Sequence, residues 1–79
     1  MSDHALPLST LSVGKKGKVS AVSVDGLLRR RLLDLGIVPD SIIEVVRISP
    51  AGDPIAYLIK GSLIGLRKSE AGRILVYPF

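Results

Sequence analysis

DGLLRRRLLDLGIVP, residues 25–39, reads as a short helix with a defined beginning and a defined end. At about 100° per residue, Leu28, Leu32 and Leu35 fall on one narrow stripe of this helix. Leu33 lies off the stripe, so we expect it to be the aliphatic residue that stays outside the core. The three leucines of the stripe are expected to seal one end of the structure that the rest of the chain forms.

Both ends of the helix, predicted over residues 27–35, have sequence signals. Asp25 is placed to cap the N-terminus, where its carboxylate can accept from the free N–H groups of the first turn. Gly36 suits the left-handed position after the helix, and Ile37 is the apolar residue expected to fold back. Pro39 prevents the helix from continuing.

Outside this segment the chain is rich in short runs of Val and Ile separated by Gly, Pro and Asp. Such runs predict strands joined by turns, here over residues 18–24, 41–48, 55–60, 63–67 and 73–77. We therefore expect a mainly β fold, a small antiparallel barrel of five strands with one short α-helix between the first two. Residues 1–7 are expected to form an N-terminal arm, and residues 8–79 a single domain.

The expected core follows from the faces of these elements. It comprises Val19, Leu28, Leu32, Leu35, Ile37, Ile43, Val45, Tyr57, Ile59, Ile64, Leu66, Ile74 and Val76.

Composition argues against catalysis and against a cofactor or metal. The chain has no cysteine and one histidine, His4 in the arm, so no activated nucleophile or thiolate site is expected. The acidic residues are scattered singly, whereas a metal site needs several converging ligands. The glycines and lysines of residues 14–17 lead into a strand, whereas a phosphate-binding loop leads into a helix.

A net charge of +4 admits an anionic partner without choosing one. The longest apolar runs are far below the ~18 residues that a membrane-spanning helix needs, and the first residues do not resemble a secretory signal. We expect a cytoplasmic protein that does not insert into membranes.

Two groups of residues are candidates for binding a partner protein. Arg29 and Arg30, with Leu33, form one possible surface of the helix, although consecutive arginines can also form an ordinary solvated face. Leu58 and Leu63 are expected on the outer face of the sheet, where an apolar patch often marks a contact site. These leucines can instead be exposed singly or covered by the arm.

Three motifs in order carry a resemblance to a known family. Residues 28–39, LRRRLLDLGIVP, are similar to the pattern R-R-L-x-x-L-G-I/L-x-P-G of the ferrous iron transport protein A (FeoA) family, with Asp40 in place of its final Gly. Residues 49–54, SPAGDP, resemble the family's hairpin tip. Residues 64–71, IGLRKSEA, resemble its I-x-L-R-x-x-E-A signature.

The resemblance implies an SH3-like barrel that acts as an accessory protein in bacterial ferrous iron uptake. Its implied partner is the membrane permease FeoB, which carries a GTP-binding domain, and its implied role is to dock on that permease or to modulate it.

Two other functions remain open from the sequence. Residues 13–19, VGKKGKV, resemble the KOW motif of RNA-binding SH3-like modules, although few aromatic residues are present for stacking on bases. A repressor-like barrel that binds a proline-rich peptide is disfavoured for the same lack of aromatic residues. Self-association through an exposed strand edge is a further expectation.

Overall fold

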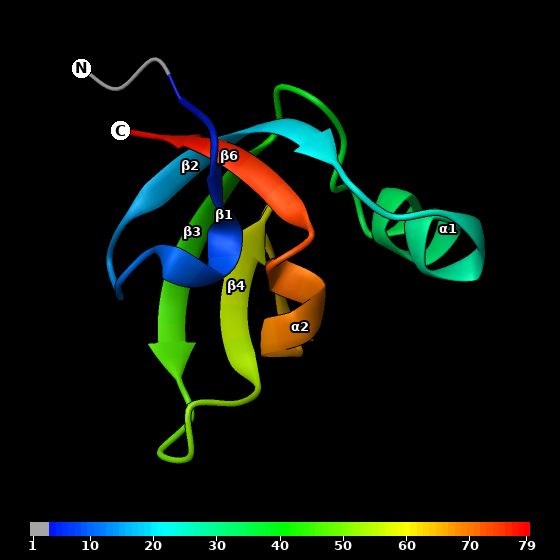
Figure 1. Cartoon of the computed structure of the whole chain (residues 1–79). Coiled ribbons are helices and arrows are strands. Elements are labelled where there is room, and N and C mark those ends of the chain that lie inside the picture. Colours follow the sequence, from blue (N-terminus) through cyan, green and yellow to red (C-terminus); the bar gives the residue numbers. More distant parts are fainter. Residues whose placement is uncertain (1–3) are drawn as a thin grey trace.

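The computed structural model describes residues 4–79 as a strongly coiled antiparallel sheet with a helix standing out from it (Figure 1). The strands are β1 (Leu6–Pro7), β2 (Lys16–Val22), β3 (Ile42–Ile48), β4 (Ile55–Ile59), β5 (Ser62–Leu66) and β6 (Ile74–Pro78). The helices are α1 (Gly26–Asp34), α2 (Lys68–Ala71) and a 3₁₀ helix, η1 (Leu8–Thr10).

The sheet has six strands in the order β1-β6-β2-β3-β4-β5. The prediction of five strands was wrong by one, because Leu6 and Pro7 of the expected arm pair with Val76 and Leu75 of β6. A two-residue strand has no periodicity that a sequence can reveal. Consequently α1 follows the second strand, not the first, and residues 1–3 of the expected arm lie outside the described part of the chain.

The end of α1 has the predicted geometry, whereas its beginning lacks one predicted bond. Gly36 has φ 94°, its N–H donates to the Leu33 carbonyl, and the Ile37 N–H donates to the Leu32 carbonyl. These two bonds form a Schellman motif that buries Ile37 against the barrel. Asp25 occupies the N-cap position with extended backbone, but its carboxylate makes no capping hydrogen bond.

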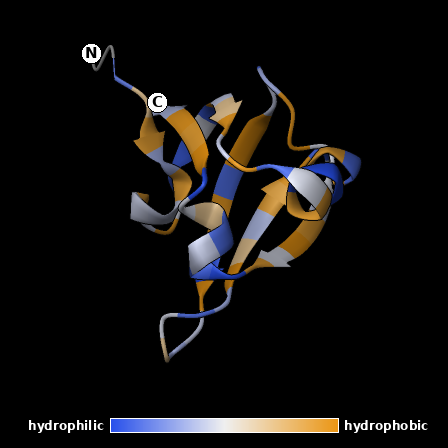
Figure 2. Cartoon of the chain, turned by 45° about the vertical axis from the view of Figure 1, so that its right-hand side comes forward, coloured by the Kyte–Doolittle hydropathy of each residue, from blue (hydrophilic) through white to orange (hydrophobic). Residues whose placement is uncertain are grey.

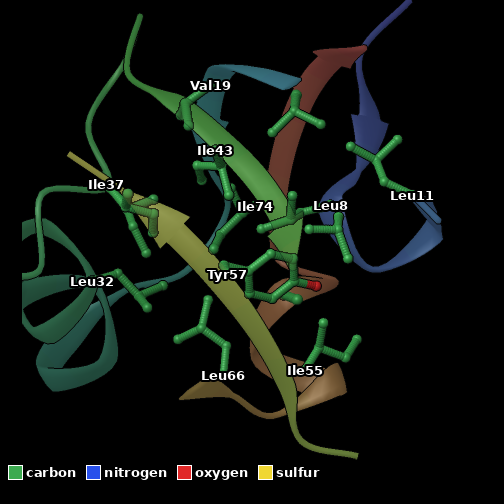
Figure 3. Packing of buried hydrophobic residues seen from close by; sticks show 14 of the residues in the cluster. Leu8, Leu11, Val19, Leu32, Ile37, Ile43, Ile55, Tyr57, Leu66 and Ile74 are labelled. Carbon is green, nitrogen blue, oxygen red and sulfur yellow. The ribbon is translucent and has the colours of Figure 1, made fainter. Parts of the chain in front are cut away.

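The core lies inside the coiled sheet, around the ring of Tyr57 (Figure 3). Its buried apolar members are Leu8, Leu11, Val19, Val22, Leu32, Ile37, Ile43, Val45, Ile55, Tyr57, Ile59, Leu66, Ala71, Ile74 and Val76. Figure 2 shows that the strands are largely hydrophobic, whereas α1 has both hydrophobic and hydrophilic stretches.

Three predicted core residues are not fully buried. Leu28 and Ile64 are partly buried and pack against the core, and Leu35 is 36% exposed because it is the C-cap where α1 leaves the barrel. The seal at this end is therefore Leu32 and Ile37. Leu33 is half-buried, so it is not the most exposed leucine of the helix.

No helix in residues 4–79 is long and apolar enough to span a membrane.

Candidate docking surface

The three consecutive arginines of α1 have three different partners. Arg29 donates to the main-chain carbonyl of Val22, which draws its side chain back onto β2. Arg30 lies 3.9 Å from Asp34 in an exposed i,i+4 pair, and Arg31 forms an ion pair with Glu70 of α2. Both Arg29 and Arg30 are exposed but engaged within the chain, and their role in binding a partner stays a prediction.

Sequence reasoning missed the most exposed aliphatic residue of α1. Leu27 is 90% exposed in the first turn, one residue before the half-buried Leu28. Its position outside the Leu28–Leu32 stripe was a usable signal, because a helix turns by about 100° between neighbours.

The two predicted strand residues of the surface do come together. Leu58 of β4 and Leu63 of β5 are direct cross-strand partners, and they are 37% and 58% exposed. In the next pair of the same ladder that faces outward, Ala56 lies opposite Gly65. The outer face of this hairpin is therefore a ridge of two leucines beside a floor of two small residues.

Two adjoining hollows flank the small residues. One, of about 240 Å³, has Ala56, Leu63 and Arg47 in its walls. The other, of about 340 Å³, has Arg31, Arg67, Asp53 and Glu70 in its walls. Pro54 and Gly65 line both hollows, so the two lie side by side, and together they are called the β5 groove hereafter.

Glu70 holds the polar end of the β5 groove in place. One carboxylate oxygen accepts from the Arg67 N–H at 2.9 Å and the other accepts from Arg31. The Arg67 N–H, assisted by the Arg31 guanidinium, lowers the pKa of Glu70 although partial burial opposes this. Asp53 likewise accepts from the Lys68 N–H at 2.9 Å. Both acidic groups of the groove are thus engaged within the protein.

The KOW-like segment has structural reasons for its glycines. Gly14 has φ 89° in a turn, and a Cβ on Gly17 would lie 2.7 Å from a methyl carbon of Val76. Lys15 and Lys16 are exposed, and Lys18 lies 3.6 Å from Asp40. Nothing in this arrangement requires an RNA backbone, and RNA binding stays a prediction.

The described residues contain no group of three or more His, Asp or Glu side chains placed to hold a metal ion.

Comparison with known proteins agrees with the sequence motifs. The FeoA domain family matches residues 6–78. A curated relative, the Fe(2+) transport protein A/Fe(2+) transporter FeoB fusion protein of Porphyromonas gingivalis, is 35% identical over 69 residues. That match covers 87% of this chain but only 8% of the fusion protein.

Solved structures share the fold. The FeoA protein of Chlorobium tepidum is 39% identical with a TM-score of 0.86, over 91% of this chain and 69% of that one. FeoA of Stenotrophomonas maltophilia, described as a prokaryotic SH3 domain protein and solved with zinc, is 30% identical with a TM-score of 0.78. The latter match covers 87% of this chain and 86% of that chain, which identifies the coiled sheet as an SH3-like fold.

Proposed function

Because this chain belongs to the FeoA family of ferrous iron transport proteins, we propose that it is a non-enzymatic cytoplasmic accessory protein that docks on the ferrous iron permease FeoB. The observation that carries the proposal is the exposed pair of Leu58 and Leu63 beside the β5 groove. Adjacent exposed aliphatic side chains on a small domain often mark a site that binds another protein.

The fusion protein of Porphyromonas gingivalis supports the choice of partner. In that relative a FeoA segment and the permease are one polypeptide, so the two are held at a high effective concentration. Contact between a FeoA domain and the permease requires a surface on the domain that fits the permease.

Titration of the purified cognate permease in lipid nanodiscs with the full chain tests the proposal. We expect Leu58→Ser and Leu63→Ser each to weaken binding by about tenfold, because each removes an aliphatic contact worth on the order of 1–2 kcal/mol. Leu27→Ser is the matched control, since it removes an even more exposed leucine from α1. Absence of binding by the unmodified chain, or equal losses in all three variants, would contradict the proposal.

Lys15→Glu separates docking from the RNA-binding alternative. Lys15 is exposed in the segment between η1 and β2, and it does not line the β5 groove. We expect this variant to bind the permease as the unmodified chain does, whereas an RNA-binding surface would lose affinity and show a strong dependence on salt.

A further inference from the structure

Gly65 differs from every other glycine of the chain in having no internal reason to be glycine. Of the eight glycines, all within residues 4–79, Gly14, Gly26, Gly36, Gly52 and Gly61 have φ between 67° and 94°. A Cβ on Gly17 would overlap Val76, and one on Gly72 would lie 3.4 Å from the Lys68 carbonyl oxygen. A Cβ on Gly65 would meet nothing within 4 Å, and its φ is not positive.

A glycine inside a strand weakens the strand by about 0.5–1 kcal/mol, and it commonly marks a place where a ligand or another backbone approaches closely. Gly65 is in the middle of β5 and lies in the floor shared by the two hollows of the β5 groove. The open space above it is therefore space for something outside this chain.

Within residues 4–79, the backbone on the outer side of Gly65 is also unpaired. In this part of the chain β5 is the last strand of the sheet and pairs with β4 alone. A two-residue turn at Lys60 and Gly61 makes Ile59–Ser62 a hydrogen-bonded pair. Because hydrogen-bonded and non-hydrogen-bonded pairs alternate along an antiparallel ladder, Leu63 and Gly65 belong to non-hydrogen-bonded pairs. Their N–H and C=O groups therefore point away from β4, toward the free edge. No charged residue or proline interrupts Ser62–Leu66, although such residues commonly guard an exposed edge.

The lining of the groove also includes Arg47 and Arg67, and the charge of Arg67 already acts on Glu70. Arg47 lines the hollow over Ala56 and Arg67 lines the hollow beside Glu70, and neither forms an ion pair within residues 4–79. The carboxylates nearby, Asp53 and Glu70, already accept hydrogen bonds from main-chain N–H groups. Over both hollows, Arg31, Arg47 and Arg67 face Asp53 and Glu70, so the lining has an excess of one positive charge that favours an incoming carboxylate.

We propose that the β5 groove binds an extended segment of a partner protein, which adds a strand to β5 and places an aliphatic side chain over Ala56 and Gly65 and an acidic side chain against Arg67. Main-chain hydrogen bonds give such a complex its affinity, and the two hollows select the side chains. The identification of the partner as the permease rests on the proposed function, whereas the chemistry of the segment rests on the groove alone.

Gly65→Val is the decisive variant, because it fills the groove without a clash inside the protein. Valine favours strands, so thermal unfolding should show equal or greater stability than the unmodified chain. Ser62→Val is the matched control, since it places the same exposed side chain on the same strand outside both hollows.

Two probes are titrated into the full chain: the cognate permease in nanodiscs, and a hexapeptide of sequence TVTLTE with blocked ends. We expect the peptide to shift and protect the amide resonances of residues 63–67. Gly65→Val should weaken both interactions at least about tenfold, Ser62→Val should change neither, and Arg67→Gln should weaken the peptide but not its TVTLTQ analogue.

The outcomes separate the two proposals. Permease binding that Gly65→Val leaves unchanged overturns the groove as the site for the permease and leaves docking intact. If the permease does not bind the unmodified chain, the proposed function fails, and the peptide alone then decides the groove. If the peptide does not shift the amide resonances of residues 63–67, the groove proposal is overturned. It is also overturned if these resonances shift with the concentration of the chain itself, since the occupant would then be a second copy.

Discussion

Arg31 of α1 and Glu70 of α2 are joined by an ion pair across 39 positions of sequence, and this pair links the two helices. The same carboxylate accepts from the Arg67 N–H, and the Glu70 N–H donates to the Arg67 carbonyl at 2.9 Å. The Arg and Glu of two separate family-like motifs therefore meet in one contact. Their roles here are structural, since they shape the wall of the β5 groove.

Replacing Glu70 by Gln should destabilise the protein at neutral pH by about 1 kcal/mol, because the amide keeps an acceptor for Arg67 but loses the charge that Arg31 pairs with. The pKa of Glu70 is lowered in the folded state. Its contribution is therefore present above the ordinary carboxyl pKa and is lost as the pH falls through the folded pKa. Urea unfolding at several acidic pH values should show a shallower decline in the variant.

Asp34→Asn is the control for that experiment. Asp34 pairs with Arg30 at 3.9 Å, and both side chains are highly exposed. We expect less than about 0.5 kcal/mol from this change. Equal effects of the two substitutions would show that the Arg31–Glu70 link between the helices adds no stability of its own.

Tyr57→Phe should raise the free energy of unfolding by about 1 kcal/mol. The Tyr57 hydroxyl is buried and has no hydrogen-bond partner in the described part of the chain, and such an unpaired group costs about 1–3 kcal/mol. Figure 3 shows the ring within the cluster and its oxygen directed away from Leu32 and Ile37. A loss of stability in denaturant unfolding would show that the hydroxyl has a stabilising partner.

The same residue predicts a decline of stability in alkali. Burial raises the pKa of Tyr57 from 10.0 to about 12. Between these values the unfolded chain has released the proton while the folded chain still holds it, so stability falls with rising pH. Comparison of the unmodified chain with Tyr57→Phe by alkaline unfolding isolates this component, which should be missing from the variant.

Two glycine-to-alanine substitutions should differ sharply. In Gly17→Ala the new Cβ would lie 2.7 Å from Val76 Cγ2 and 3.3 Å from Leu11 Cδ1, so β2 and β6 must separate. Such overpacking costs about 1–3 kcal/mol. Gly65→Ala enters open space and should be neutral or stabilising by up to about 1 kcal/mol. Thermal unfolding of both variants measures the difference, and similar stabilities would refute the close approach at Gly17.

Gly36→Ala should cost on the order of 1 kcal/mol or more, because alanine is strained at the observed φ of 94°. Its Cβ would also lie 3.3 Å from Lys60 Cδ, a flexible side chain that can move. The double variant with Lys60→Ala separates the two effects in urea unfolding. We expect most of the cost to persist in the double variant, and full recovery would attribute it to Lys60 instead.

Sequence alone determined the elements whose signals are local. Helix α1 stops before Gly36 because glycine adopts the positive φ of the position after the C-cap without strain, and Ile37 and Pro39 complete the stop signal. Strands β3 and β4 follow from runs of β-branched residues between turn residues. Period-two alternation also predicted that Leu58 faces outward.

Tertiary structure decided what depends on contacts between distant residues. It added β1 by pairing Leu6 with Val76, buried Leu8 and Ala71, and directed Arg29 to Val22 and Arg31 to Glu70. It also showed that Gly65 has open space above it whereas Gly17 does not. The type of a residue sets its backbone preference, but its neighbours in space are set only when the whole sheet has closed around the core. No local sequence pattern could therefore have predicted the groove.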